Sequence, residues 1–331
     1  DSHTQGSSFS RPVNIPSVVG SLAELGGRET KPICLAIGMF DGVHRGHRAV
    51  LELAVNEARS VNGLAAVLTF PEHPAKFLRP GKEPPLLMDA ETKTKSLLDA
   101  GADSVVLRTF DESFANVPYE EFIVYLKDNV SSLHCVCVGE NFNFGKDRMG
   151  EADYLRKNGE HYGLKVYVAD GILDGEEPIS SSRIREALAA GEIEEVNHML
   201  GYSYRTCGTV VEGRGLGSEM GFPTLNIPFA PEARPAYGVY LVKIICPNLS
   251  EPKHAVANYG VRPTIAGGDV QPLLEVHLLG EEDFSSYKPG DELAVKLLRF
   301  LRPECKFDSL DSLKTQIAAD KIEAEKLVLT L

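Results

Sequence analysis

Short apolar runs alternate with helical patterns along the first half of the chain. Each run is bounded by polar or glycine-rich residues, and between the runs apolar residues recur every three to four positions. The expected strands are 33–37, 64–70, 104–107, 135–138 and 165–168, and the expected helices are 47–59, 91–100, 119–129 and 151–161. Alternating strands and helices predict an α/β domain with a parallel sheet and helices on both of its faces.

The pattern changes near residue 200. Runs of alternating polarity, separated by Gly and Pro, replace the helical patterns and predict a compact antiparallel barrel. A helix over 183–199 is expected at the junction, and a final helix is expected after Asp308 or Ser309. Its apolar stripe would be Leu310, Leu313, Ile317 and Ile322. The expected barrel strands are 208–212, 239–245, 255–258, 274–278 and 293–298.

The two patterns predict two closely joined domains, residues 13–199 and 200–331. A chain of 331 residues is long enough for each domain to bury its own core. Residues 1–12 are polar and Ser-rich, and we expect them to be disordered or left over from expression. The chain begins with Asp1 rather than Met, so processing of a longer precursor stays open.

Charge and composition exclude several kinds of partner. A net charge of −13 argues against nucleic acid and against anionic membranes, since either would need a basic face. No apolar stretch is long enough to span a bilayer, and the N-terminus lacks the apolar core of a secretory signal. The six cysteines have no zinc-site spacing, which favours reduced thiols in a cytoplasmic protein. Self-association stays open.

The first candidate site is the stretch Gly38-Met-Phe-Asp-Gly-Val-His-Arg-Gly-His47, between an expected strand and an expected helix. Such a turn presents backbone N–H groups and a positive dipole end to a phosphate. His44 and His47 can donate hydrogen bonds to phosphate oxygens, and Gly46 allows close approach of a ligand. The alternative is a tight turn with two solvated histidines. The presence of both histidines together with Asp41 favours the phosphate site.

The second candidate site is Gly208–Asn226, which contains five glycines but no Walker A sequence. From the residues alone, a flexible loop and a phosphate site are about equally expected. Thr224 and Asn226 lie two residues apart on an extended chain and therefore share one face. Together they can offer neutral oxygens to a Mg²⁺ ion that also holds ATP phosphates.

The first stretch resembles the HxGH signature of the nucleotidyltransferase superfamily, and its fuller form is similar to that of FMN adenylyltransferases. A second match is Ile179-Ser-Ser-Ser-Arg-Ile-Arg185, and two loops, 69–74 and 139–145, match less closely. In the latter loop Asn141 stands where the family has an acid. The resemblance implies that ATP and its phosphates are bound by Gly38, Phe40, Asp41, His44, Gly46, His47, Ser181 and Arg185, with the two histidines catalytic and Asn141 binding the flavin.

Pro223-Thr-x-Asn226 resembles a motif of riboflavin kinases, and the resemblance continues through 237–240, 258–264, 274–277 and 302–304. It implies that Glu275 is the base that takes the proton from the ribityl 5′-hydroxyl. Ser218 stands where the family usually has an Arg. The further implied roles are Mg²⁺ binding by Thr224 and Asn226, flavin binding by Arg302, and ATP-phosphate binding by Gly213, Gly215, Gly217 and Gly221.

Both resemblances together cover about residues 30 to 325, in the domain order of the bifunctional bacterial-type riboflavin kinase/FMN adenylyltransferase (FAD synthetase) family. They imply a Rossmann-like nucleotidyltransferase domain with a parallel sheet, then an antiparallel β-barrel kinase domain with a terminal helix. The implied reactions convert riboflavin to FMN and FMN to FAD, with ATP as co-substrate and Mg²⁺ as cofactor. The flavins are substrates and products rather than prosthetic groups.

Three alternatives stay open at this stage. One domain alone could be active, since Asn141 and Ser218 are departures from the family pattern, one in each domain. The chain could be a non-catalytic flavin-binding protein, although the presence of the phosphate-site residues argues against this. The N-terminal domain by itself could adenylylate another acceptor, such as a nicotinamide or pantetheine phosphate.

Overall fold

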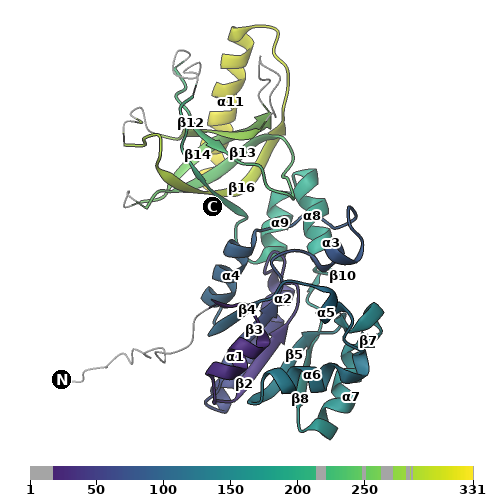
Figure 1. Cartoon of the computed structure of the whole chain (residues 1–331). Coiled ribbons are helices and arrows are strands. Elements are labelled where there is room, and N and C mark those ends of the chain that lie inside the picture. The colour runs from purple at the N-terminus through teal and green to yellow at the C-terminus, as the bar shows by residue number, and fades with distance from the viewer. Residues whose placement is uncertain are drawn as a thin grey trace, which may run out of the picture. The chain divides into compact units, whose positions relative to one another are not determined.

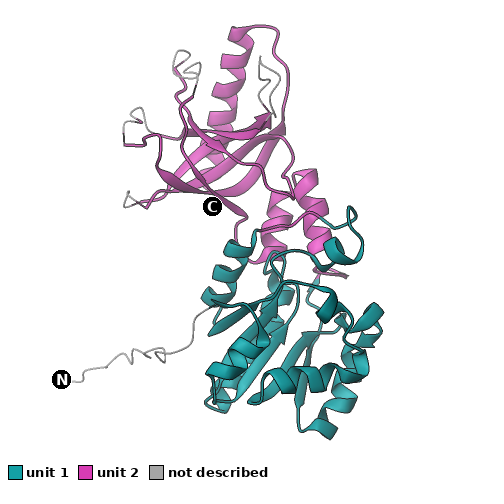
Figure 2. Ribbon diagram, in the orientation of Figure 1, with its two compact units in different colours: residues 1–84, 89–173 teal, residues 85–88, 174–331 magenta. Residues whose placement is uncertain are grey.

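The chain forms two compact units in a computed structural model (Figures 1 and 2). Unit 1 contains residues 1–84 and 89–173, and unit 2 contains residues 85–88 and 174–331. The structure describes residues 18–213, 221–247, 251–261, 271–280, 284 and 286–330. Residues 1–12, Gly215, Gly217 and Ser218, which the sequence singled out, lie outside the described residues.

Unit 1 is built on a six-stranded parallel sheet. The sequence predicts a parallel sheet and five of its strands, but not the two-residue strand Val18–Val19, which is too short for a pattern. The strand order is β1-β4-β3-β2-β5-β8, and every neighbouring pair is parallel. Residues of β2 are all buried, which explains why this strand is a continuous apolar run rather than an alternating one. The strands are β1 Val18–Val19, β2 Ile33–Ile37, β3 Leu64–Thr69, β4 Ser104–Leu107, β5 Leu133–Gly139 and β8 Lys165–Ala169.

The helices of unit 1 confirm the four that periodicity predicts, with shifted ends. These four are α2 Arg45–Ser60, α4 Ala90–Asp99, the η1 turn Tyr119–Glu121 with α6 Phe122–Asn129, and α7 Ala152–Gly159 with the η3 turn Glu160–Tyr162. The sequence did not predict several short elements, since each spans too few residues for a periodic pattern. They are α1 Leu22–Arg28, α3 Pro74–Leu78, α5 Glu112–Ala115, the η2 turn Lys146–Arg148, and the hairpin of β6 Asn143–Phe144 with β7 Gly150–Glu151.

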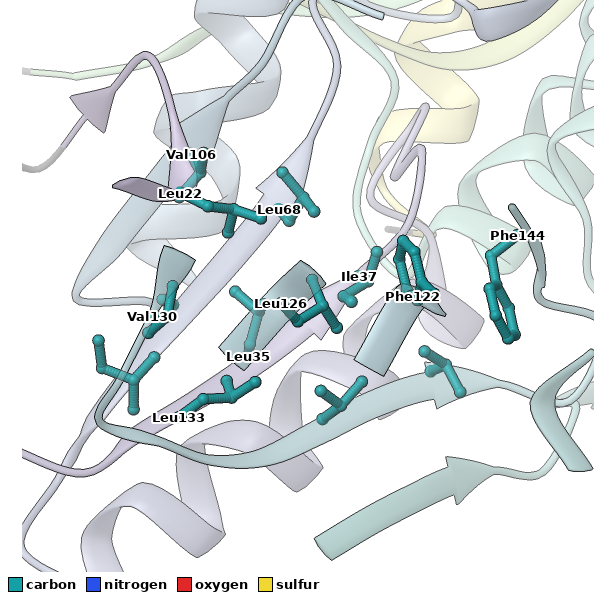
Figure 3. Close-up of a cluster of buried hydrophobic side chains, with 14 of the residues drawn as sticks. Leu22, Leu35, Ile37, Leu68, Val106, Phe122, Leu126, Val130, Leu133 and Phe144 are labelled. Carbon is teal, nitrogen blue, oxygen red and sulfur yellow. The ribbon is translucent and has the colours of Figure 1, made fainter. Parts of the chain in front are cut away.

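One face of this sheet packs against helices in a large apolar cluster (Figure 3). Leu126 of α6, Val130 just after this helix and Leu22 of α1 pack with strand residues such as Leu35 and Leu133, and all five are buried. Burial of such side chains contributes about 1.5–3 kcal/mol each relative to exposure. The sheet is therefore a rigid platform, and the loops at the carboxyl ends of its strands are held in fixed places.

Unit 2 contains the predicted antiparallel barrel. The strand order is β11-β16-β13-β14-β15-β12, and the pairs are antiparallel. The N–H of Val211, just after β11, donates to the carbonyl of Asn226 in β12 at 2.9 Å, so the two edge strands meet and the barrel nearly closes. The strands are β11 Arg205–Thr209, β12 Leu225–Pro228, β13 Gly238–Ile245, β14 Lys253–Val261, β15 Pro272–Leu278 and β16 Glu292–Pro303.

The expectation of one helix over 183–199 is wrong. The segment forms two helices, α8 Ser181–Ala190 and α9 Ile193–Leu200. They are separated because Gly191 ends α8 in the left-handed conformation at φ +82°. The hairpin of β9 Leu173–Asp174 and β10 Glu177–Pro178 precedes them. Asn197 of α9 fixes this helix to the barrel, since its Nδ2 donates to the carbonyl of Leu297 at 2.9 Å.

The terminal helix, α11 Leu310–Val328, begins as predicted at Ser309, which forms a capping box with Ser312. The predicted apolar stripe is wrong in part, because Leu310 and Ile322 are 67% and 53% exposed. The buried positions of α11 are Asp320 and Ala324. Asp320 faces the barrel because it forms an ion pair with Arg302 of β16, and this pairing sets the orientation of the helix.

Candidate active sites

The turn between β2 and α2 has an unusual backbone. Phe40 and Val43 have φ angles of +52° and +40°, which are rare for aromatic and β-branched residues. Such conformations cost about 1–3 kcal/mol each and occur mainly where the surrounding structure holds them for function. Phe40 is buried, and the carboxylate residue Asp41 is only 2% exposed. The turn is therefore a fixed structure rather than a solvated loop.

The two histidines of this turn lie against each other. Their rings are stacked with centroids 3.5 Å apart and an interplanar angle of 18°. His44 is the N-cap of α2, and its Nδ1 accepts a hydrogen bond from the backbone N–H of His47 at 3.3 Å. Since Nδ1 accepts, a neutral His44 ring carries its proton on Nε2, which is then the donor. The structure brings both predicted phosphate donors to one helix N-terminus, where Gly46 also lies.

A cavity of about 670 Å³ opens beside this turn. Gly38 from the turn and Asn141 from the loop after β5 both line it, so two predicted site residues share one cavity. Aromatic rings form much of its wall: Phe110 contacts Phe70 and Phe114 edge-on, at centroid distances of 5.3 and 5.6 Å. Such a wall suits a large planar ring system.

Sequence reasoning missed the aromatic wall and one charged residue of this unit. Phe110 and Phe114 follow β4 four residues apart, which is a weak signal that any core helix could give. Lys93 of α4 is 1% exposed, and its Nζ donates to the carbonyl of Met39 at 3.2 Å and to that of Phe70. Burial lowers the pKa of Lys93 to about 8, while the Asp41 carboxylate opposes this shift.

The serine–arginine motif begins α8 in unit 2. The N-cap is Ser180, whose Oγ accepts from the backbone N–H of Arg183 at 3.2 Å, and Ser181 is the first helical residue. The guanidinium of Arg183 is neutralised, since it pairs with Asp174 at 3.3 Å and with other carboxylates. Arg185 forms a different contact, donating from Nε to the Pro85 carbonyl at 2.6 Å.

In the barrel, strand register brings together residues that are far apart in the sequence. Glu275 of β15 lies opposite Asn226 of β12 and opposite Asn258 of β14. Asn258 in turn lies opposite Val239 of β13, and Val239 lies opposite Arg302 of β16. Directly opposed residues of an antiparallel pair share a face. The predicted base, one predicted metal ligand and the predicted flavin ligand therefore lie in one row, which we call the cross-strand row.

The described start of the glycine-rich loop lies directly on this row. A Cβ on Gly213 would lie 2.2 Å from Nδ2 of Asn226, so any other residue here would displace the carboxamide. Asn226 itself is 5% exposed. Thr224 is half-buried, and Gly221 at the other described end of the loop is exposed. The backbone at Gly213 thus passes close to the carboxamide of Asn226.

His277, two residues after Glu275, fixes the strand that carries Thr224. Its Nδ1–H donates to the carbonyl of Pro223 at 2.8 Å. The ring packs edge-on against Phe222 and is stacked on Phe284, at centroid distances of 5.7 and 5.9 Å. Burial lowers the pKa of His277, while the hydrogen bond to the Pro223 carbonyl opposes this shift. The sequence marked His277 only as part of a motif, and the structure shows its contact.

Arg302 is held in place by the terminal helix. Its Nε and Nη2 donate to the two carboxylate oxygens of Asp320 at 2.8 and 2.7 Å, a bidentate pair. The hydrogen-bonded Asp320 carboxylate raises the pKa of Arg302. Gln316 also donates to Asp320, at 2.9 Å. Arg302 therefore links the cross-strand row to α11.

Among the described residues, no group of three His, Cys, Asp or Glu side chains could hold a metal ion. The neutral oxygens of Thr224 and Asn226 nevertheless fit Mg²⁺, which keeps waters and takes most other ligands from substrate phosphates. In the part of the chain that the structure describes, no helix is both long and apolar enough to cross a bilayer.

Comparison with known proteins finds relatives along nearly the whole chain. The FAD synthetase family matches residues 27–183, and the riboflavin kinase family matches residues 200–328. The bifunctional riboflavin kinase/FMN adenylyltransferase of Escherichia coli K12 is 37% identical over 293 residues, which cover 88% of this chain and 91% of that protein. The protein of the same name from Haemophilus influenzae is 37% identical over 286 residues, 86% of this chain and 91% of that protein.

A solved structure shares the fold over nearly the whole chain. It is a Streptococcus pneumoniae protein described as a macrolide-efflux protein, with a TM-score of 0.81 and 25% identity. The match covers 94% of this chain and 99% of that one.

Proposed function

This chain belongs to the family of bifunctional riboflavin kinase/FMN adenylyltransferases, and we propose that it makes FAD from riboflavin in two ATP-dependent steps. The barrel of unit 2 transfers the γ-phosphoryl group of ATP to riboflavin, giving FMN and ADP. The HxGH turn of unit 1 serves the second step, in which FMN and ATP give FAD and pyrophosphate. The observation that carries this proposal is the cross-strand row, which aligns Asn226, Glu275 and Arg302.

In the kinase step, Glu275 accepts the proton of the ribityl 5′-hydroxyl as its oxygen attacks the γ-phosphorus. Thr224 and Asn226 hold Mg²⁺, which neutralises the polyphosphate when it is bound. His277 keeps Thr224 in place through the Pro223 carbonyl. The family resemblance assigns Gly213, Gly215, Gly217 and Gly221 to the ATP phosphates, and Arg302, fixed by Asp320, orients the flavin.

In the adenylyl step, a phosphate oxygen of FMN attacks the α-phosphorus of ATP and pyrophosphate leaves. This reaction needs no protein nucleophile, so the residues position the phosphates and neutralise their charge. His44 and His47 donate to phosphate oxygens from the N-terminus of α2, whose positive dipole end assists them. The family resemblance assigns Ser181 and Arg185 to the ATP of this step.

The acceptor of the adenylyl group is FMN rather than a nicotinamide or pantetheine phosphate. The cavity beside the HxGH turn has room for a fused three-ring system, and its wall is aromatic. Asn141 lines this cavity and keeps hydrogen-bonding capacity where the family has an acid. The kinase of the same chain supplies the acceptor. We assign the reaction to the cytoplasm, where ATP is available and thiols stay reduced, since the six cysteines are all free.

The test is a chromatographic time course of the purified protein with riboflavin, excess ATP and Mg²⁺. FMN should rise first and then fall as FAD appears. If FMN accumulates without FAD, only the kinase is active. Asn141, which stands where the family has an acid, would then be the first residue to replace with an acidic one. If neither product appears, FMN is supplied directly: FAD would then leave only the adenylyltransferase, and no product would favour a flavin-binding protein.

A further inference from the structure

A buried lysine lies behind the phosphate-binding turn of unit 1. Lys93 is 1% exposed, whereas Lys95, two residues further along the same helix, is exposed. Lysine is almost never fully buried unless it is paired, because removing an ammonium group from water is costly. The helix needs only an apolar residue at this position. The charge at position 93 therefore calls for a reason beyond packing.

The ammonium group of Lys93 links two loops. Its Nζ donates to the carbonyl of Met39, in the turn after β2, and to the carbonyl of Phe70, just after the neighbouring strand β3. Thr69 reinforces the same place, since its Oγ1 donates to the Met39 carbonyl at 2.9 Å. Met39 directly precedes Phe40, whose backbone has a positive φ. The contacts of Lys93 thus hold the strained part of the turn.

The charge of Lys93 also compensates a buried anion. Asp41, which is 2% exposed, is the charged group of the turn that acts on Lys93. Burial lowers the pKa of Lys93 to about 8, and the Asp41 carboxylate opposes this shift. With that pKa, about nine-tenths of the lysine is protonated at pH 7. A buried carboxylate in a phosphate site repels the phosphates unless a cation offsets it. The buried ammonium group of Lys93 supplies this positive charge.

We propose that Lys93 is a positioning residue for adenylyl transfer, which holds the Gly38–His47 turn in its phosphate-binding conformation and offsets the charge of Asp41 there. Lys93 contacts the backbone of the turn and acts on the substrates through it. This inference rests on the proposed adenylyltransferase function of unit 1.

The test compares the full-length variants Lys93→Met and Lys95→Met with the wild type. FAD formation from FMN and ATP is measured by chromatography, and riboflavin phosphorylation by the same preparations reports the integrity of unit 2. Lys93→Met should lower kcat/KM for FAD formation about 100-fold, as expected when reacting groups are misplaced. Lys95→Met should keep the wild-type rate. A wild-type rate in Lys93→Met would overturn the proposal.

Two further readouts separate the charge from simple packing. Wild-type FAD formation should fall above about pH 8 as Lys93 loses its proton, and the variant should lack this fall. Thr69→Val removes the neutral hydrogen bond to the Met39 carbonyl but keeps the ammonium, so it should lose less than 10-fold and keep the wild-type pH profile. If Thr69→Val loses as much as Lys93→Met, the role is structural and the proposal fails.

If Lys93→Met does not fold, the pH profile of the wild type and the rate of Thr69→Val decide whether the proposal holds. A wild-type rate that stays level between pH 7.5 and 9.5 would overturn the proposal. A wild-type chain that makes no FAD from FMN would overturn the proposed function of unit 1, and the Lys93 proposal with it.

Discussion

The two units build their sites in opposite ways. Unit 1 places its chemistry on one turn at the carboxyl edge of a parallel sheet, where ligands of α/β folds gather. Its histidines are three residues apart, and strained backbone at Phe40 and Val43 orients them. Unit 2 places its chemistry on the strands themselves, and antiparallel register aligns Asn226, Glu275 and Arg302 from three separate strands.

Because the two sites are supported differently, we expect them to tolerate different substitutions. A turn held by its own backbone is sensitive to whatever supports that backbone, such as Lys93 and Thr69. A cross-strand row is held by the barrel, so a single side chain can be changed there without moving its neighbours. Substitutions in the two units should therefore separate the two activities, or show whether backbone support matters more in unit 1 than in the barrel.

The largest effect is expected from Glu275→Gln. Removing a general base lowers the rate of the chemical step by about 10³-fold, so riboflavin phosphorylation should fall by that factor. FAD formation from supplied FMN should stay at the wild-type rate, because the row belongs to the barrel. The control is Glu292→Gln, at an exposed position of β16, which should change neither rate. Near-normal phosphorylation by Glu275→Gln would remove this residue from the role of base.

The mirror experiment is His47→Ala. Loss of one phosphate donor should lower FAD formation about 10²-fold and leave riboflavin phosphorylation unchanged. His161→Ala, at an exposed position of the same unit, serves as the control. The assignment of His47 would be wrong if FAD formation survived, or if both activities fell together.

Gly213→Ala tests the close approach of the backbone to Asn226 in the barrel. The new methyl group would lie 2.2 Å from Nδ2 of Asn226, so the carboxamide or the loop must move. We expect a fall of about 10-fold in riboflavin phosphorylation, with FAD formation from FMN unaffected. Steady-state rates of both steps check this. A fully active Gly213→Ala enzyme would show that Asn226 can move without loss.

Asp320→Asn should give a smaller effect, since it leaves the catalytic groups in place. The amide keeps one acceptor oxygen but turns an NH₂ donor toward the guanidinium, so one of the two hydrogen bonds to Arg302 is lost and the other is no longer made to a charged acceptor. We expect KM for riboflavin to rise about 5-fold with little change in kcat. A change in kcat alone would show that Arg302 acts on the reacting phosphate rather than on the flavin.

The smallest effect concerns the acid stability of unit 1. His134 and Lys165 donate to Glu57 at 2.7 and 3.1 Å, and the hydrogen bond from His134 is the main reason that the pKa of Glu57 is lowered to about 2. A lowered carboxylate pKa stabilises the fold above pH 4.5, and this stabilisation is lost as the pH falls toward 2. The denaturant concentration at the midpoint of unfolding should therefore fall less steeply in Glu57→Gln than in the wild type between pH 4.5 and 2.5. An unchanged slope in denaturation curves would contradict this.

Much of the fold could be predicted because its signals are local. The buried strands of unit 1 are continuous apolar runs, and Ser309 is a capping residue in front of a helical pattern. The split of 183–199 into two helices depends on the left-handed backbone conformation of Gly191. A glycine inside a helical pattern does not by itself indicate that conformation. The buried face of α11 depends on the Arg302–Asp320 pair, which joins residues 18 positions apart.

The proximity of His44 and His47 could be predicted for the same reason, since both belong to one contiguous stretch, while their role stays a prediction. Lys93 was not, because 54 residues separate it from Met39, and its neighbour Lys95 is an ordinary exposed lysine. In unit 2 the residues Asn226, Glu275 and Arg302 were each assigned from separate motifs. Their alignment depends on strand register, which no single motif contains.

We propose that the chain carries two separate sites, each of which works when the other is disabled. The most direct test mixes the Glu275→Gln and His47→Ala proteins with riboflavin, ATP and Mg²⁺ and follows the flavins by chromatography. Neither variant alone should form FAD at an appreciable rate, but the mixture should, because FMN released by the second protein is adenylylated by the first. A mixture that makes FMN but no FAD, although Glu275→Gln converts supplied FMN, would contradict the claim.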